Sequence, residues 1–153
     1  MYLDLDLHFS DGVSHAFYLG NAPSAPAQLL TLSIHHAAPG FFPVSPLSAL
    51  PKPDDESFDP FTLSLPLERG ASNTTFARVW LDAVEKVKEA FRPDFVVLQC
   101  GVDGLAGDPY AIWNWGLGGV DTPGSLGWCV QRVVEGWNVK TLLLGGGALY
   151  SDL

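Results

Sequence analysis

Basic residues are scarce in this sequence, and their scarcity excludes one large class of function. The chain has 8 Lys and Arg residues against 17 Asp and Glu residues, which gives a formal net charge of −9 at pH 7. A protein that binds nucleic acid directly needs a basic surface facing the phosphates, so we expect no direct nucleic-acid contact. An acidic surface instead suits a cationic partner such as a lysine-rich peptide.

Cysteines and long apolar runs are scarce as well. The two cysteines, Cys100 and Cys129, lie in apolar segments and are predicted to be small buried hydrophobes in a reducing compartment, without a disulfide framework. No stretch reaches the roughly 20 apolar residues of a membrane span. The first residues carry carboxylates where a signal peptide needs positive charge. We therefore expect an intracellular, soluble protein with no membrane partner.

Hydrophobic residues, by contrast, are plentiful, and their spacing predicts an α/β fold. They make up 47% of the 153 residues, enough for one domain with a packed core. The order of helices and short apolar strands is typical of βαβ units on a buried parallel sheet. Strands are predicted over residues 2–8, 28–35, 62–67, 95–99 and 140–144, helices between residues 72 and 92 and after residue 125, a short helical segment over residues 11–17, and loops over residues 21–27 and 46–59.

Each of the two longer helices should bury one apolar stripe. Residues that recur at a spacing of 3.6 fall on one face of a helix, and that face packs against the sheet. The two stripes are Phe76, Trp80, Ala83, Val84, Val87 and Phe91 in the first helix, and Leu126, Cys129, Val130, Val133, Val134 and Trp137 in the second.

The first predicted strand alternates leucine with ionisable residues. Its period of two places Asp4, Asp6 and His8 on one face of a strand and the leucines on the other. Asp and His are oxygen and nitrogen ligands of zinc sites. For this segment alone, an edge strand with one solvated face is an equally good interpretation.

Three predicted strands end in residues suited to chemistry. Asp6 and His8 end the first strand, Asp103 follows the fourth, and a triple glycine with Tyr150 beyond it follows the last. Parallel strands share one carboxyl edge, where ligands collect. Two carboxylates and an imidazole there would form a three-ligand site with an open position, as in catalytic zinc sites. Taken singly, Asp103 could instead cap a turn, and the glycines could form a plain tight turn.

A series of segments along the chain carries the motifs of one family. They are Asp4-Leu-Asp-Leu-His8, Asp11-Gly12-Val13, Thr31-Leu-Ser-Ile-His35, Pro39-Gly-Phe-Phe-Pro43, Val96-Val-Leu-Gln-Cys-Gly-Val-Asp103, Leu105-Ala-Gly-Asp-Pro109 and Leu142-Leu-Leu-Gly-Gly-Gly147. In this order they resemble the zinc-dependent class I histone deacetylases. The resemblance implies the α/β, parallel-sheet, three-layer arginase–deacetylase fold in truncated form, with residues 1–153 as a partial histone deacetylase domain.

The resemblance also implies two kinds of metal site. The zinc ligands would be Asp6, His8 and Asp103. Asp4, with the backbone carbonyls of Asp6, His8, Ser33 and Ile34, would hold a structural potassium ion, and carbonyls of Phe17 and Phe61 would serve a second monovalent cation.

Catalytic and channel residues follow from the same resemblance. Asp4 and Asp11 would orient a pair of catalytic histidines, and Tyr150 would donate to the developing oxyanion. The substrate channel would be formed by Phe42 as a wall and Tyr110 at the lip, with Gly146 and Gly147.

Several positions depart from the family pattern. The sequence begins at the first metal strand, whereas the family's catalytic histidine pair lies in the half before it. His35-His36 matches a different family segment and is not expected to replace that pair, and His15 should be a surface histidine. Phe9-Ser10 stands where the family has His-Gly, and Tyr150 reaches the donor position only if the preceding turn absorbs one residue.

The expected activity is zinc-dependent removal of acetyl groups from lysine side chains of histones or other proteins. Without the histidine pair, we expect this amide hydrolysis to be impaired in this chain. The implied partners are an acetylated histone tail or other acetyl-lysine protein and a corepressor complex, in chromatin and transcription regulation. Two alternatives stay open: an inactive metal-binding module that acts as a binding or regulatory partner, and a deacetylase of polyamines or other small amines.

Overall fold

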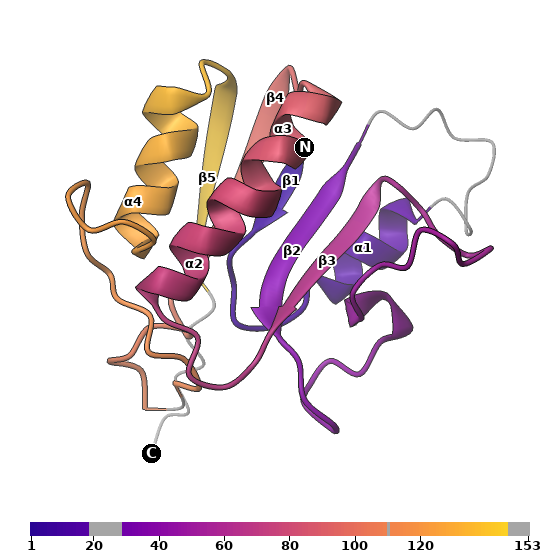
Figure 1. Cartoon of the computed structure of the whole chain (residues 1–153), viewed down its shortest axis with the longest axis horizontal. Coiled ribbons are helices and arrows are strands. Elements are labelled where there is room, and N and C mark those ends of the chain that lie inside the picture. The colour runs from indigo at the N-terminus through magenta and orange to yellow at the C-terminus, as the bar shows by residue number, and fades with distance from the viewer. Residues whose placement is uncertain (19–28, 110, 147–153) are drawn as a thin grey trace.

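Five parallel strands form one sheet. A computed structural model of the chain describes residues 1–18, 29–109 and 111–146. The strands are β1 (Tyr2–Asp4), β2 (Thr31–His36), β3 (Thr62–Leu67), β4 (Phe95–Gly101) and β5 (Lys140–Gly146). Their order across the sheet is β3-β2-β1-β4-β5, and every neighbouring pair runs parallel (Figure 1). The short first strand is therefore central, which rules out the edge-strand interpretation of the opening segment.

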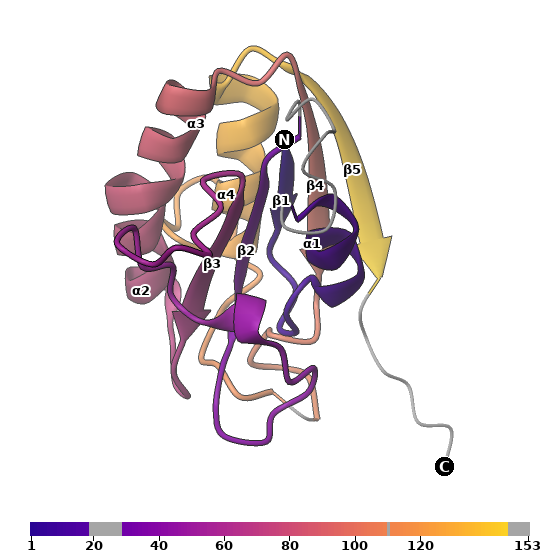
Figure 2. The same ribbon diagram turned by 90° about the vertical axis from the view of Figure 1, so that its right-hand side faces the viewer.

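Helices lie on both faces of this sheet. Figure 2 shows α2, α3 and α4 on one face and α1 on the other. The helical elements are α1 (Asp11–Phe17), the 3₁₀ turn η1 (Pro46–Ser48), α2 (Asn73–Val79), the π-helical turn η2 (Trp80–Val84), α3 (Glu85–Phe91), α4 (Leu126–Gln131) and the π-helical turn η3 (Arg132–Gly136). The predicted parallel α/β, three-layer arrangement is confirmed. Within the described ranges, no helix is long and apolar enough to cross a membrane.

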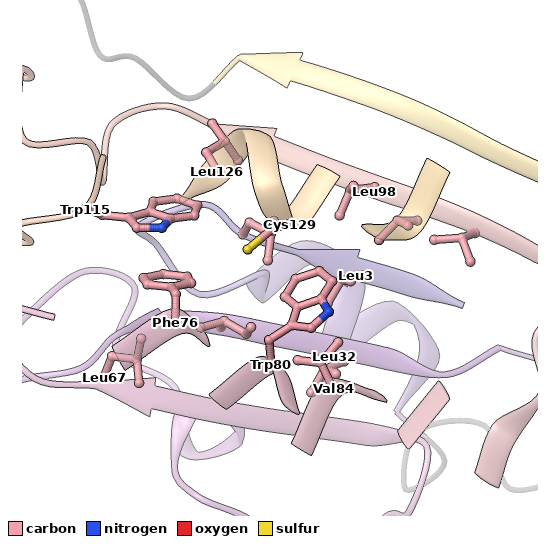
Figure 3. Packing of buried hydrophobic residues seen from close by; sticks show 14 of the residues in the cluster. Leu3, Leu32, Leu67, Phe76, Trp80, Val84, Leu98, Trp115, Leu126 and Cys129 are labelled. Atoms are coloured by element: carbon pink, nitrogen blue, oxygen red, sulfur yellow. The ribbon is translucent and has the colours of Figure 1, made fainter. Parts of the chain in front are cut away.

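The core lies between the sheet and the larger helical layer (Figure 3). Phe76, Trp80 and Val84, from the predicted stripe of the first long helix, are fully buried. The ring of Phe76 stacks on Trp115, with centroids 4.0 Å apart and planes within 9°. A capping box at Ser72 begins this helix, so the predicted start is confirmed. Both cysteines are free thiols, but only Cys129 is buried and Cys100 is half-buried.

One sequence prediction about burial is wrong. Val134 was predicted on the buried face of the second helix, yet 47% of it is exposed. Leu126, Cys129 and Val133 are buried, whereas Val134 lies in the π-helical turn η3, where the period of 3.6 residues assumed in the prediction no longer holds. Leu142, Leu143 and Leu144 are exposed in β5, which forms an edge of the sheet as described.

The two loops predicted from composition have different outcomes. The loop over residues 46–59 contains η1 and ends at Asp59, which is buried and accepts hydrogen bonds from the Phe61 N–H and the Thr62 hydroxyl. Its far end is therefore fixed to the start of β3. The loop over residues 21–27 lies outside the described residues.

One carboxylate joins the two long helical segments. Glu85 accepts hydrogen bonds from the indole N–H groups of Trp80 and Trp137 at 2.9 and 3.0 Å, and from Arg132 Nε at 2.8 Å. The side chain of Glu85 is only 17% exposed. Buried indole donors need such an acceptor, so this carboxylate sets how the two segments pack.

Replacing Glu85 should therefore destabilise the fold. We expect Glu85→Ala to lower the free energy of unfolding by about 2–4 kcal/mol, because it leaves indole donors and Arg132 without their acceptor. Glu85→Gln should lose less, since an amide oxygen still accepts. Urea denaturation measures both, with the exposed Glu89→Ala on the same helix as control. Equal effects of Glu85→Ala and Glu89→Ala would contradict the role of this carboxylate.

Candidate metal centre

Three ionisable side chains meet at the carboxyl edge of β1 and β4. Asp6 and His8 follow β1, and Asp103 follows β4, its neighbour in the sheet. One ligand atom from each of the three lies within 4.8 Å of the others. The structure thus brings together residues nearly a hundred positions apart, in the arrangement that the sequence predicted.

The local backbone differs from the prediction. The sequence predicted a strand through residue 8, but β1 ends at Asp4. The Asp4 carboxylate accepts the N–H of Asp6 at 2.9 Å, and the Asp6 carboxylate accepts the N–H of His8 at 2.8 Å. Aspartate side chains that bond the backbone two residues on form turns that compete with strand pairing. Two successive turns of this kind end the strand pairing, but the alternation persists in the burial of the side chains: Leu5 and Leu7 are buried, whereas Asp6 and His8 are half-buried.

Asp103 fastens the two strand ends together. Its Oδ1 accepts the N–H of Leu7 at 3.1 Å, and its Oδ2 lies 2.8 Å from Nδ1 of His8. The same His8 nitrogen lies 3.3 Å from Oδ1 of Asp6. Hydrogen bonds to Asp103 and Asp6 raise the pKa of His8 to about 9. In the metal-free chain, Nδ1 of His8 therefore carries a proton that faces the carboxylates of Asp6 and Asp103.

The donor set fits a divalent cation. Two carboxylates and an imidazole are ligands of zinc and of several other transition metals. The backbone also makes room for this set: a Cβ on Gly101, the last residue of β4, would overlap the Asp6 carboxylate. Gly101 was not among the predicted site residues, although a glycine that ends a strand just before a candidate ligand is a signal of close approach.

Asp4 is as deeply buried as Asp103, and both are less exposed than Asp6. It is 3% exposed, and its Oδ2 accepts the Tyr2 hydroxyl at 2.9 Å. Burial raises the pKa of Asp4 from 3.8 to about 7. Asp4 lies opposite Ser33 in the register of β1 and β2, and both Ser33 and Ile34 are fully buried. These three predicted potassium ligands thus occupy adjacent strands.

The other predicted site residues have varied surroundings. Asp11 begins α1 and lies 3.1 Å from Nε2 of His15. Phe42 is 74% exposed and approaches His8 edge-on, with centroids 6.3 Å apart. Gly146 ends β5 with a φ of 124°. The candidates Tyr110, Gly147 and Tyr150 lie outside the described residues.

The residues expected to bind a second monovalent cation lie apart from this cluster in sequence. Phe17 ends α1 and is 48% exposed. The carbonyl of Phe61 accepts the N–H of Thr31 at 2.8 Å. Their role as cation donors stays a prediction.

The paired histidines contact backbone carbonyls. Nε2 of His35 lies 3.0 Å from the Ser48 carbonyl, and Nδ1 of His36 lies 2.9 Å from the Leu67 carbonyl. Both rings are buried, and burial lowers the pKa of His35. Each ring thus fixes a loop or strand end, which agrees with the expectation that this pair is not catalytic.

The chain matches known proteins along nearly all of its length. Residues 1–150 match the histone deacetylase domain. Histone deacetylase 8 of Xenopus laevis is 32% identical over 151 residues, which cover 98% of this chain and 42% of the relative. Histone deacetylase 8 of Danio rerio is 33% identical over 150 residues, 96% of this chain and 35% of the relative. Histone deacetylase 2 of Oryza sativa subsp. japonica is 32% identical over 148 residues, which cover 96% of this chain and 26% of the relative.

The chain therefore belongs to the histone deacetylase domain family. Its five-stranded parallel sheet with helices on both faces is consistent with the predicted α/β arginase–deacetylase fold. The chain spans less than half the length of the relatives named above.

The close approach at Gly101 can be tested by adding one methyl group. We expect Gly101→Ala to weaken Zn²⁺ binding by about 10–100-fold, because the new Cβ displaces the Asp6 carboxylate while the strand itself persists. Isothermal titration calorimetry measures the affinity. Gly107→Ala is the matched control, since a Cβ there meets nothing within 4 Å. Equal affinities of the two variants would count against the proposed placement of Asp6.

Burial of Asp4 predicts a pH-dependent stability of the metal-free chain. Its folded-state pKa of about 7 lies above the ordinary 3.8, so the protonated form favours folding below about pH 4, and that contribution is lost as the pH rises through 7. Asp4→Asn keeps an acceptor and carries no charge. Its melting temperature should exceed that of the unsubstituted chain by several degrees at pH 8 and by less at pH 5.

Thermal unfolding in the presence of a chelator measures this difference. The exposed Asp82→Asn serves as the control. A stabilisation by Asp4→Asn that is the same at both pH values would contradict the assigned cause.

Proposed function

We propose that this chain forms the metal-binding part of a zinc-dependent deacetylase that acts on acetylated lysine side chains. The observation that supports it most is the cluster of Asp6, His8 and Asp103 at the carboxyl edge of β1 and β4, in a member of the histone deacetylase domain family. When bound there, zinc supplies Lewis-acid polarisation of the acetyl carbonyl and activation of water.

The residues around the cluster hold its geometry. Asp103 is fixed by the Leu7 N–H, so its second oxygen stays directed at His8. The Asp6 carboxylate is fixed by the His8 N–H and by the bare backbone of Gly101. Beneath them, Asp4 with Ser33 and Ile34 would hold a potassium ion, which would offset the cost of burying an ionised carboxylate.

The substrate is expected to enter past Phe42. Its exposed ring lies edge-on to His8, and an apolar wall suits the methylene stem of acetyl-lysine. Tyr110 would form the lip, Gly146 and Gly147 would line the channel, and Tyr150 would donate to the oxyanion. The net charge of −9 favours a basic substrate segment such as a histone tail. We further propose that the chain acts within a corepressor complex in the nucleus or cytoplasm.

The four histidines of the chain bear on its activity. His8 faces the two carboxylates, His15 lies 3.0 Å from the Ser45 hydroxyl, and His35 and His36 face backbone carbonyls. None of them forms a free pair beside the metal cluster that could act as general base and acid. We infer that turnover by this chain alone is impaired. The same observation favours a non-catalytic metal-binding module as the second candidate.

Metal stoichiometry tests the proposed centre. The purified chain should bind about one zinc ion, and Asp103→Asn should reduce that affinity by at least about tenfold because a neutral amide is a poorer ligand. Inductively coupled plasma mass spectrometry after dialysis measures the content. The exposed Asp121→Asn serves as control. Zinc retained equally by both variants would contradict the assignment of Asp103.

Turnover separates the two candidates. Losing a general base typically costs about 10²–10⁴-fold, so the zinc-loaded chain should hydrolyse an acetyl-lysine peptide at least about 100-fold more slowly than the Xenopus laevis relative. Complete inactivity with intact zinc binding would favour the non-catalytic module. Turnover equal to that of the relative would contradict the inferred impairment, and preference for an acetylated polyamine would contradict the lysine substrate.

A further inference from the structure

One face of the His8 ring is covered by a neighbouring aromatic side chain. The ring of Phe41 stacks on the imidazole of His8, with centroids 5.2 Å apart and planes within 13° of each other. Phe41 follows β2 and comes directly before Phe42, whose ring meets His8 edge-on and is mostly exposed. The two phenylalanines therefore have different relations to the same histidine, and only Phe41 lies flat against it.

Phe41 also contacts a second histidine. Its ring meets the ring of His36 edge-to-face, with centroids 4.7 Å apart and planes at 76°. His36 is 6% exposed, and its Nδ1 donates to the carbonyl of Leu67, the last residue of β3, at 2.9 Å. A continuous set of contacts thus joins the end of β3 to His8 through two rings.

The hydrogen bonds of His8 involve only one of its two ring nitrogens, so they do not fix the orientation of the ring by themselves. Histidine ligands of metals usually donate their second ring N–H to a carboxylate or carbonyl, which fixes the ring orientation. Nδ1 of His8 faces Asp103 and Asp6, and within the described residues Nε2 makes no hydrogen bond. A stacked ring restricts the same rotation that a second hydrogen bond would restrict.

We propose that Phe41 is a positioning residue that fixes the His8 ring for metal binding, and that His36 transmits this support from the end of β3. The inference rests on the metal centre proposed above. It assigns to the Phe41-Phe42 pair two separate tasks, orientation of a ligand by Phe41 and formation of the channel wall by Phe42.

Substitutions in the full chain separate the ring from its bulk. Phe41→Leu removes the aromatic face and keeps an apolar side chain, whereas Phe41→Tyr keeps the ring and should restore binding. His36→Asn keeps a donor for the Leu67 carbonyl but removes the edge contact. Phe95→Leu is the matched control, because Phe95 is exposed and lies at the opposite end of the sheet, where β4 begins.

Two readouts are needed. In the metal-free protein, nuclear magnetic resonance should show ring-current-shifted His8 ring protons that lose this shift in Phe41→Leu and keep it in Phe41→Tyr and Phe95→Leu. With Co²⁺ as the probe, Phe41→Leu should weaken binding by about three- to tenfold and alter the visible absorption of the bound ion, which reports ligand geometry. His36→Asn should weaken binding about two- to threefold.

The outcomes distinguish this inference from the proposed function. If the unsubstituted chain binds no Co²⁺, the proposed metal centre fails and the inference fails with it. If Co²⁺ binds but its affinity and spectrum are the same in Phe41→Leu, the inference alone is overturned. If Phe41→Leu acts as expected and His36→Asn matches the unsubstituted chain, the role given to His36 is wrong.

Discussion

The candidate site depends on the two oxygens of one carboxylate. Asp103 accepts the backbone N–H of Leu7 with one oxygen and contacts Nδ1 of His8 with the other. The first contact joins the end of β4 to the end of β1, and the second sets the position of a candidate ligand. Because Asp103 is 4% exposed, both contacts are shielded from water and are stronger than they would be at the surface. A substitution of Asp103 would therefore affect both the junction of the two strands and the candidate site.

Much of this arrangement could be predicted from the sequence. The apolar stripe of Phe76, Trp80 and Val84 has the helical period, and these residues are the most deeply buried of the first long helix. Parallel strands bring their carboxyl ends to one edge, which is why residues as distant as His8 and Asp103 could be expected to meet. Family motifs suggested the roles proposed for these residues, which spacing alone does not supply.

Other features depend on contacts that periodicity does not encode. The opening segment has the period of a strand, but the carboxylates of Asp4 and Asp6 bond to nearby backbone N–H groups and end the strand early. Val134 was predicted on the same face as the buried Val133, but both lie in the π-helical turn η3, which the period of 3.6 residues does not predict. Phe41 could not be distinguished from Phe42, because only the folded chain shows which ring lies flat on His8.

The central claim is that one divalent cation is bound jointly by side chains from the ends of β1 and β4. Anomalous diffraction at the zinc absorption edge, from crystals of the zinc-loaded chain, tests it most directly. The account predicts a single strong peak about 2.0–2.2 Å from oxygens of Asp6 and Asp103 and from a nitrogen of His8. A peak that lies on other residues, such as the Cys100 sulfur, or one that omits Asp103, would contradict the account.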